Sequence, residues 1–169
     1  FGYSVAVDGD TVVVGAGCYG TPCPIASAIY VFRTTDDGAT YNQVATLSPE
    51  AKFDGSGVSV AISGDTIVLG SIPGYNDEGA AYVFRASGAT YVEVATLTAA
   101  DAAADAWFGS NTFGSSVAID GDTIVIGASV VVGSCCLVYV YRTTDDGVTY
   151  EQKLTARDAG SDDNFGTSV

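Results

Sequence analysis

A pattern of small and β-branched residues around a Gly-Asp pair occurs three times in this chain. The three copies read SVAVDGDTVVVGA from Ser4, SVAISGDTIVLGS from Ser59 and SVAIDGDTIVIGA from Ser116. Units that recur at a period of about 55 residues indicate a repeat protein, in which each unit buries its apolar faces against the next. The chain is therefore expected to fold as a row of similar units, and its function is expected to be one that an array performs.

The repeats are assigned to residues approximately 1–54, 55–112 and 113–164, and residues 165–169 start a fourth. The last five residues, Phe-Gly-Thr-Ser-Val, match the first five, Phe-Gly-Tyr-Ser-Val, at every position except the third. Two interpretations fit this match: the sequence is a window of a longer array, or its last strand completes the first repeat of a neighbouring copy. Both point beyond an isolated monomer.

Composition narrows the class of protein. With 47% hydrophobic residues and a positive mean hydropathy, the chain is expected to be globular or a packed rod. Its net charge of -14 repels phosphate backbones and anionic lipid, so nucleic acid is not an expected partner. No apolar run approaches the roughly 18 residues that cross a bilayer, so membrane insertion is not expected.

Each repeat divides into four short strands. Two apolar runs flank the Asp8-Gly9-Asp10 turn, and such a turn between β-branched runs is a strong hairpin signal. A third strand carries large aromatics, and a fourth begins near Tyr41, Tyr91 and Tyr150. The expected fold is all-β: tandem four-stranded antiparallel blade-like sheets of the β-propeller type. The third strand is expected at residues 28–33, 80–85 and 137–142.

The Phe-Gly opening, the Ser-Val-Ala-Ile-Asp-Gly-Asp-Thr-Ile-Val core, the Gly-Ala close and the later Tyr-Val-Phe strand resemble the FG-GAP repeat family, which includes integrin α-subunit propellers. The second repeat departs from the pattern with Ser56-Gly57, and both Phe108-Gly109 and Phe113-Gly114 precede the third. The proline that follows Gly-Ala in the family is absent throughout. The resemblance implies extracellular or cell-surface interaction and no particular reaction.

Catalytic and metal-binding signals are weak in this sequence. The chain has no histidine, which excludes histidine-dependent catalysis and histidine metal sites. The carboxylate pairs Asp36-Asp37 and Asp145-Asp146 could in principle support acid-base chemistry of the glycosidase kind. They are expected instead to serve polar turns. The alternating-Asp calcium loop of some FG-GAP relatives is missing, and only the connectors around Asp101 and Asp158 offer weak ion binding. The chain is thus expected to be no enzyme and to use no cofactor or metal.

Three arginines, Arg33, Arg85 and Arg142, end the third strand of each repeat. Such a row could bind an anionic ligand. Because cations are scarce in the chain, pairing with adjacent turn aspartates is the favoured expectation.

The four cysteines, Cys18, Cys23, Cys135 and Cys136, occupy the loop between the second and third strands of the first and third repeats. They are expected to form disulfides, which places the protein outside the reducing cytosol. A local Cys18 to Cys23 bridge is geometrically easy, whereas a bond between adjacent cysteines is strained. Cross-links between stacked copies are the alternative.

Two threonine pairs, Thr34-Thr35 and Thr143-Thr144, are candidate exposed sites for O-linked sugars, and no sequon for asparagine-linked sugars is present. The leading hypothesis is a noncatalytic extracellular structural protein that associates head to tail into a filament or long array. The alternative is part of a closed cell-surface β-propeller that acts as an adhesion module for a protein or glycan.

Overall fold

The computed structural model describes residues 1–17, 28–49, 58–71, 79–99, 111–130, 137–144, 147–158 and 165–169. In these residues the chain forms strands and turns, and they contain no helix. The strands are β1 (Ser4–Asp8), β2 (Thr11–Ala16), β3 (Ala28–Arg33), β4 (Asn42–Leu47), β5 (Val58–Ser63), β6 (Thr66–Ser71), β7 (Ala80–Ser87), β8 (Thr90–Leu97), β9 (Asn111–Asp120), β10 (Thr123–Val130), β11 (Leu137–Thr144) and β12 (Gly147–Leu154).

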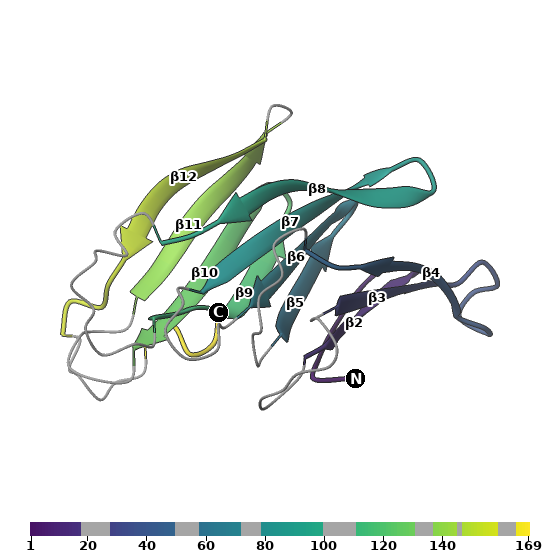
Figure 1. The fold of residues 1–169 in the computed structure, drawn as a ribbon, viewed down its shortest axis with the longest axis horizontal. Coiled ribbons are helices and arrows are strands. Elements are labelled where there is room, and N and C mark those ends of the chain that lie inside the picture. The colour runs from purple at the N-terminus through teal and green to yellow at the C-terminus, as the bar shows by residue number, and fades with distance from the viewer. Residues whose placement is uncertain are drawn as a thin grey trace.

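The strands form three separate four-stranded antiparallel sheets, each with its strands side by side in chain order. Sheet 1 contains β1–β4, sheet 2 contains β5–β8 and sheet 3 contains β9–β12. The sheets lie face to face in a row, with sheet 2 in the middle (Figure 1). The predicted all-β fold of three tandem blade-like sheets is confirmed, and the row is open rather than closed into a ring.

The first two strands of every sheet join through the same two-residue turn. Its first residue is Gly9, Gly64 or Gly121, with φ of 52°, 54° and 56°. A glycine at this position of a two-residue hairpin is typical of a type II′ turn, which matches the right-handed twist of the strands. The central pair is thus Gly-Asp, and Asp8 and its equivalents end the preceding strand. The three turns are therefore equivalent, in agreement with the threefold recurrence of the Gly-Asp pattern.

The outer hairpin differs among the sheets. All three sheets share a bulge at the same repeat position, opposite the step that follows Val31, Val83 and Val140 of the third strand. The extra residue lies on the fourth strand. Beyond it, Tyr150 lies opposite Tyr141, whereas Glu93 lies opposite Phe84. Tyr150 is therefore not the counterpart of Tyr91, as the sequence had suggested, because β12 begins earlier than its tyrosine indicates.

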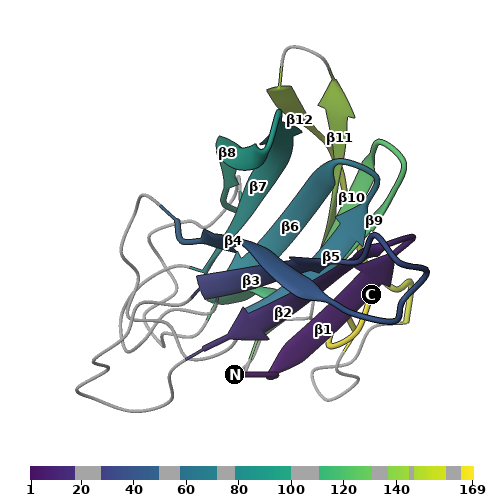
Figure 2. The same cartoon turned by 90° about the vertical axis from the view of Figure 1, so that its right-hand side faces the viewer.

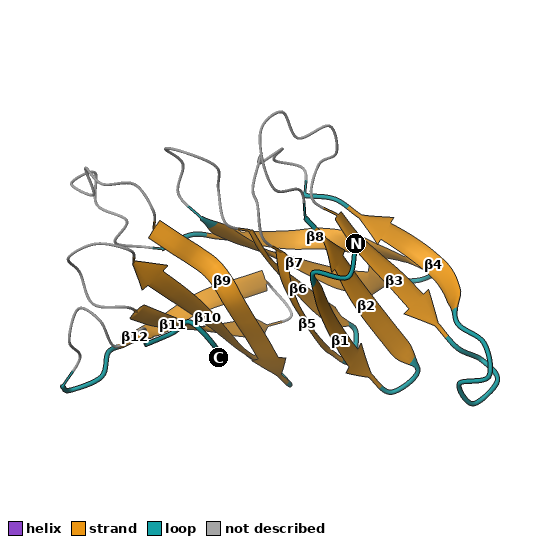
Figure 3. Cartoon of the chain, turned by 90° about the horizontal axis from the view of Figure 1, so that it is seen from below, coloured by secondary structure: helices purple, strands orange, loops and turns teal. Residues whose placement is uncertain are grey.

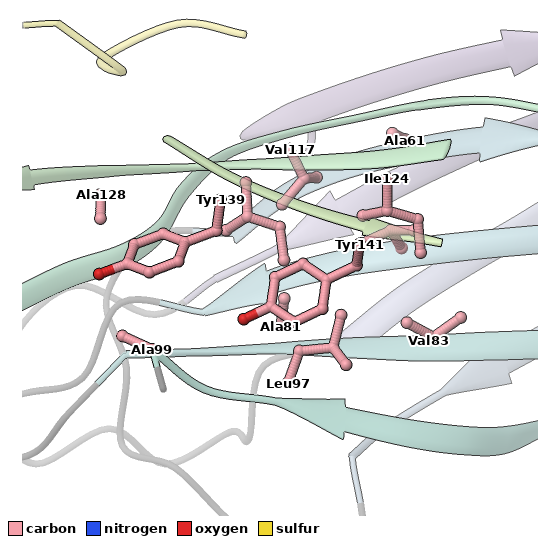
Figure 4. Close-up of a cluster of buried hydrophobic side chains, with 12 residues drawn as sticks. Ala61, Ala81, Val83, Leu97, Ala99, Val117, Ile124, Ala128, Tyr139 and Tyr141 are labelled. Atoms are coloured by element: carbon pink, nitrogen blue, oxygen red, sulfur yellow. The ribbon is translucent and has the colours of Figure 1, made fainter. Parts of the chain in front are cut away.

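Two hydrophobic cores fill the spaces between the sheets. The core between sheets 2 and 3 places the rings of Tyr139 and Tyr141 over Ala81, Leu97 and Ala99 of the preceding sheet (Figure 4). Large aromatics on one sheet thus meet small residues on the other. The core between sheets 1 and 2 is built in the same way, with Val13, Ile29, Val31 and Leu47 against Val60, Ile62, Ile67, Leu69, Tyr82 and Phe84.

Two Phe-Gly segments, Phe113-Gly114 and Phe165-Gly166, lie against the trailing faces of sheets 2 and 3. The carbonyl of Gly114 accepts a hydrogen bond from Ser59 Oγ at 2.9 Å, and the carbonyl of Gly166 accepts one from Ser116 Oγ at the same distance. A Cβ at Gly70 would overlap the Gly114 carbonyl oxygen, so only glycine allows this approach. The opener of the third repeat is therefore Phe113-Gly114, which lies within β9. The alternative Phe108-Gly109 lies outside the described residues.

Candidate functional site at the two open sheet faces

Each sheet has two apolar faces with different residues. We call the face that points toward the preceding sheet the leading face, and the face that points toward the following sheet the trailing face. The leading faces carry the larger side chains and the trailing faces the smaller ones. Leading-face residues are Val5, Val7, Val12, Val14, Tyr30 and Phe32 in sheet 1, Val60, Ile62, Ile67, Leu69, Tyr82 and Phe84 in sheet 2, and Val117, Ile119, Ile124, Ile126, Tyr139 and Tyr141 in sheet 3.

The leading face of sheet 1 is open along β1, whereas further across the sheet Val14 is buried and Val12, Tyr30 and Phe32 are half-buried. Val5 and Val7 are 65% and 66% exposed, while their counterparts in sheet 2, Val60 and Ile62, are 6% and 8% exposed. Sheet 1 lies in front of the other two in Figure 2, so none of the described strands covers this face. Among the described residues, Phe1 lies against it, with its ring 5.2 Å from that of Tyr30, centroid to centroid. Large apolar side chains thus remain at one end of the row.

The trailing face of sheet 3 is the second open face. Leu154 is 37% exposed, whereas its counterparts Leu47 and Leu97 are 6% and 7% exposed. Val125 is half-buried although Val68, at the same repeat position, is fully buried. Residues 165–169 cover part of this face, and they are held where Gly166 meets Gly127. The two ends of the row therefore present the two unlike halves of one kind of interface.

Polar contacts also cross each internal junction, at the hairpin turns. The side chain of Asp8 accepts a hydrogen bond from the backbone N–H of Gly64. One junction further, Ser63 Oγ accepts from the backbone N–H of Gly121 at 3.1 Å. The acceptor side chain always belongs to the earlier sheet and the donor amide to the later one. This relation was missed from the sequence, although a small oxygen-bearing residue before each turn glycine was its signal.

The arginine row does not behave uniformly. Arg33 Nη2 donates to the hydroxyl of Tyr91 in sheet 2 at 3.1 Å, and Arg85 Nη2 donates to the carbonyl of Thr144 in sheet 3 at 3.1 Å. Arg142 forms an ion pair with Asp122 in its own sheet at 2.9 Å. The prediction that these arginines pair with turn aspartates is therefore right for Arg142 and wrong for the other two, because the next sheet supplies their acceptors.

The first aspartate of the Asp36-Asp37 pair serves its own turn. Its carboxylate accepts hydrogen bonds from the side chain and backbone of Thr40 and from the hydroxyl of Thr34. These bonds, with those from Thr40 largest, lower the pKa of Asp36 to about 2. A carboxylate that stays ionised and is already bonded to its turn supports the turn interpretation rather than acid-base chemistry. Asp145 and Asp146 lie outside the described residues.

The candidate modification sites differ in exposure. Thr35 and Thr144 are exposed, whereas Thr34 and Thr143 are buried, with 3% and 9% of their surface exposed. The hydroxyls of both buried threonines form hydrogen bonds. The expected exposure is thus wrong for Thr34 and Thr143, because each turns inward at the end of its strand. O-glycosylation itself stays a prediction. All four candidate disulfide cysteines, Cys18, Cys23, Cys135 and Cys136, lie outside the described residues.

Other features of the described residues add little chemistry. They contain no group of three or more His, Cys, Asp or Glu side chains that could hold a metal ion. Asp101 and Asp105 lie outside the described part of the chain. Within that part, no helix is long and apolar enough to cross a membrane.

Stacked four-stranded antiparallel sheets with one meander per repeat define a propeller-type repeat protein. The model of the FG-GAP repeat family matches residues 1–32, 40–84 and 91–141, which together form most of the chain. The chain therefore belongs to the FG-GAP repeat family, and the resemblance drawn from its motifs is confirmed. No curated protein matches the sequence at a significant level.

Proposed function

We propose that this protein is a noncatalytic extracellular structural protein whose copies associate head to tail. The observation that carries the proposal is that the leading face of sheet 1, exposed along β1, has an apolar residue at every position where the faces buried at both internal junctions have one. The open trailing face of sheet 3 is the matching half. Contiguous exposed apolar surface on a soluble protein marks an interaction site.

The assembly would be heterologous because two different faces meet. Repeated contacts of this kind close into a ring when the rotation per copy allows it, and otherwise give an open filament. We favour the filament or long array. Membership of a family typical of cell surfaces, together with four cysteines, supports the extracellular location.

The second candidate function is that of a binding module, because FG-GAP membership also fits part of a closed cell-surface propeller that binds a protein or glycan. In that arrangement further blades would cover both open faces, and the loops would carry the binding site. The two functions differ in what the isolated 169-residue chain does at its open faces.

Sedimentation velocity of the oxidised chain at physiological salt tests the proposal. We expect concentration-dependent association at micromolar concentrations, because both open faces are apolar. Val7→Asp should abolish it, since it places a charge in the exposed apolar part of the leading face. The matched control is Val92→Asp on sheet 2, where the exposed Val92 lies on the outer strand and away from both end faces.

Electron microscopy of the associated wild-type protein then distinguishes filaments from rings. A compact monomer with no tendency to associate at micromolar concentration would contradict the proposal and favour the binding module. Equal loss of association in Val7→Asp and Val92→Asp would show that association does not use the leading face.

A further inference from the structure

We propose that Asp120 aligns neighbouring copies by accepting a hydrogen bond from the backbone N–H of Gly9 in the next copy. This inference rests on the head-to-tail association proposed above and adds the polar group that sets how two copies meet. Contact between apolar faces alone does not fix the position of one copy on another, because the hydrophobic effect is non-directional. A directional contact is needed to select one alignment.

The two internal junctions supply the pattern. Asp8 of sheet 1 accepts from the amide of Gly64, and Ser63 of sheet 2 accepts from the amide of Gly121. The acceptor is in both cases the residue before the turn glycine, and the donor is the turn glycine of the following sheet. Asp120 holds the acceptor position of sheet 3. The next sheet in the row would be sheet 1 of another copy, whose turn glycine is Gly9.

Both groups are exposed in the single chain. Asp120 and Gly9 are exposed, and no described residue donates a hydrogen bond to the Asp120 carboxylate. The three turns share one backbone geometry, with nearly equal φ at their glycines. The Gly9 amide is thus presented in the same way as the Gly64 and Gly121 amides that are already bonded.

Residues 165–169 lie on the face that the next copy would cover, at a distance from Asp120 itself. They are held at Gly127 and Ser116, and Ser116 precedes Asp120 by four residues along β9. At about 3.3 Å per residue this separation is roughly 13 Å. The strand-end arrows of β1 and β9 point toward the same edge in Figure 3, where the two turns lie. Gly166 meets Gly127 as Gly114 meets Gly70, so residues 165–169 take the place that residues 1–5 of a next copy would occupy. The next copy must therefore displace this segment when its Gly9 reaches Asp120.

Charge and hydrogen bonding at Asp120 act in opposite directions. Each copy carries a net charge of -14, so copies repel one another. Removing the Asp120 carboxylate lowers that repulsion and by itself would strengthen association. A weaker association after its removal would therefore report the lost hydrogen bond.

The experiment compares wild type, Asp120→Ala and Asp120→Ser by sedimentation equilibrium of the full oxidised chain. Serine removes the same charge as alanine but keeps an acceptor oxygen, as Ser63 provides at the second junction. We expect the junction Kd to weaken about three- to tenfold in Asp120→Ala. It should stay within about twofold of wild type in Asp120→Ser. Circular dichroism checks that both variants fold.

An NMR measurement reads the donor directly. The Gly9 amide proton of labelled wild-type protein should shift downfield and gain exchange protection as unlabelled protein is added. Unlabelled Asp120→Ala should not produce this change. Association of wild type with equal Kd in Asp120→Ala and Asp120→Ser, or an unchanged Gly9 amide, would overturn the Asp120 contact alone. Absence of association in wild type would instead overturn the proposed function from which the contact follows.

Discussion

Sheet 1 and sheet 2 carry the same leading-face pattern in different surroundings. Val60 of sheet 2 is buried beneath sheet 1, while Val5, at the same position of sheet 1, is 65% exposed. Both sheets form the same meander with the same turn geometry. The apolar pattern of a repeat thus indicates that its face requires a neighbouring sheet. How much each residue contributes to stability depends on whether that neighbour is present. This is expected where stability is a sum of repeat and interface contributions.

The largest expected effect compares a glycine in the middle of the row with its counterpart at the end. Gly70→Ala should cost about 3 kcal/mol of unfolding free energy, because the new Cβ would overlap the Gly114 carbonyl oxygen. Gly114 lies in β9, which contacts sheet 2 and belongs to sheet 3, so it has little room to move. Urea denaturation measures the change.

The control for that prediction is Gly127→Ala. Its Cβ would overlap the Gly166 carbonyl oxygen in the same way, but residues 165–169 can shift without separating two sheets. We expect a cost of about 1 kcal/mol. Equal costs at the two glycines would show that the middle of the row is no more constrained than its end.

A smaller effect is expected for one substitution made at equivalent valines. Val60→Ala should cost about 2 kcal/mol, from the lost burial of two methyl groups and the cavity left behind. Val5→Ala should cost less than about 0.5 kcal/mol in the dilute, unassociated chain. Thermal and urea unfolding of both variants provide the measurement.

The same two variants, Val60→Ala and Val5→Ala, also test whether association covers the open face. At concentrations where copies associate, Val5 should become buried, and the difference between the two variants should shrink. If Val5→Ala were as costly as Val60→Ala even in the dilute chain, the leading face of sheet 1 would not be open.

The third prediction concerns pH. Burial, with a smaller contribution from the charge of Glu93, raises the pKa of Tyr82 to about 12. The folded chain therefore keeps this proton to higher pH than the unfolded chain does. Stability from this group is complete below about pH 10 and is lost as pH rises through about 12. Tyr82→Phe should reduce this alkaline loss, measured by urea denaturation from pH 8 to 11. An identical alkaline slope in the variant would contradict the assignment.

Much of the fold followed from local sequence. The Gly-Asp turns and their flanking β-branched runs located the inner hairpins, because turn chemistry and alternation are short-range signals. The outer hairpin was less predictable. The same Thr-Thr-Asp-Asp-Gly sequence follows Arg33 in the first repeat and Arg142 in the third. The pairing between the third and fourth strands nevertheless stops at Arg33 in sheet 1 and continues to Thr144 in sheet 3. Local composition does not decide where a ladder ends.

The open faces could be anticipated in outline, but their polar contacts could not. A row of sheets must leave two faces uncovered, and repetition alone indicates this. The acceptors of Arg33 and Arg85 lie 58 and 59 residues away, on another sheet. Such contacts depend on how sheets are placed on one another, which no spacing within one repeat encodes. Nearby aspartates were therefore the wrong partners to choose for two of three arginines.

The smallest expected effect is that of metal removal on the melting temperature. We expect it to affect neither the middle nor the ends of the row. Both internal cores consist of apolar side chains, and the turns are held by protein hydrogen bonds. Adding EDTA should therefore change the melting temperature by less than about 2 °C, because no bound ion would contribute to the folded state. Calcium added back is the control. A fall of many degrees that calcium reverses would show that the acidic connectors around Asp101 and Asp158 bind an ion that holds the sheets together.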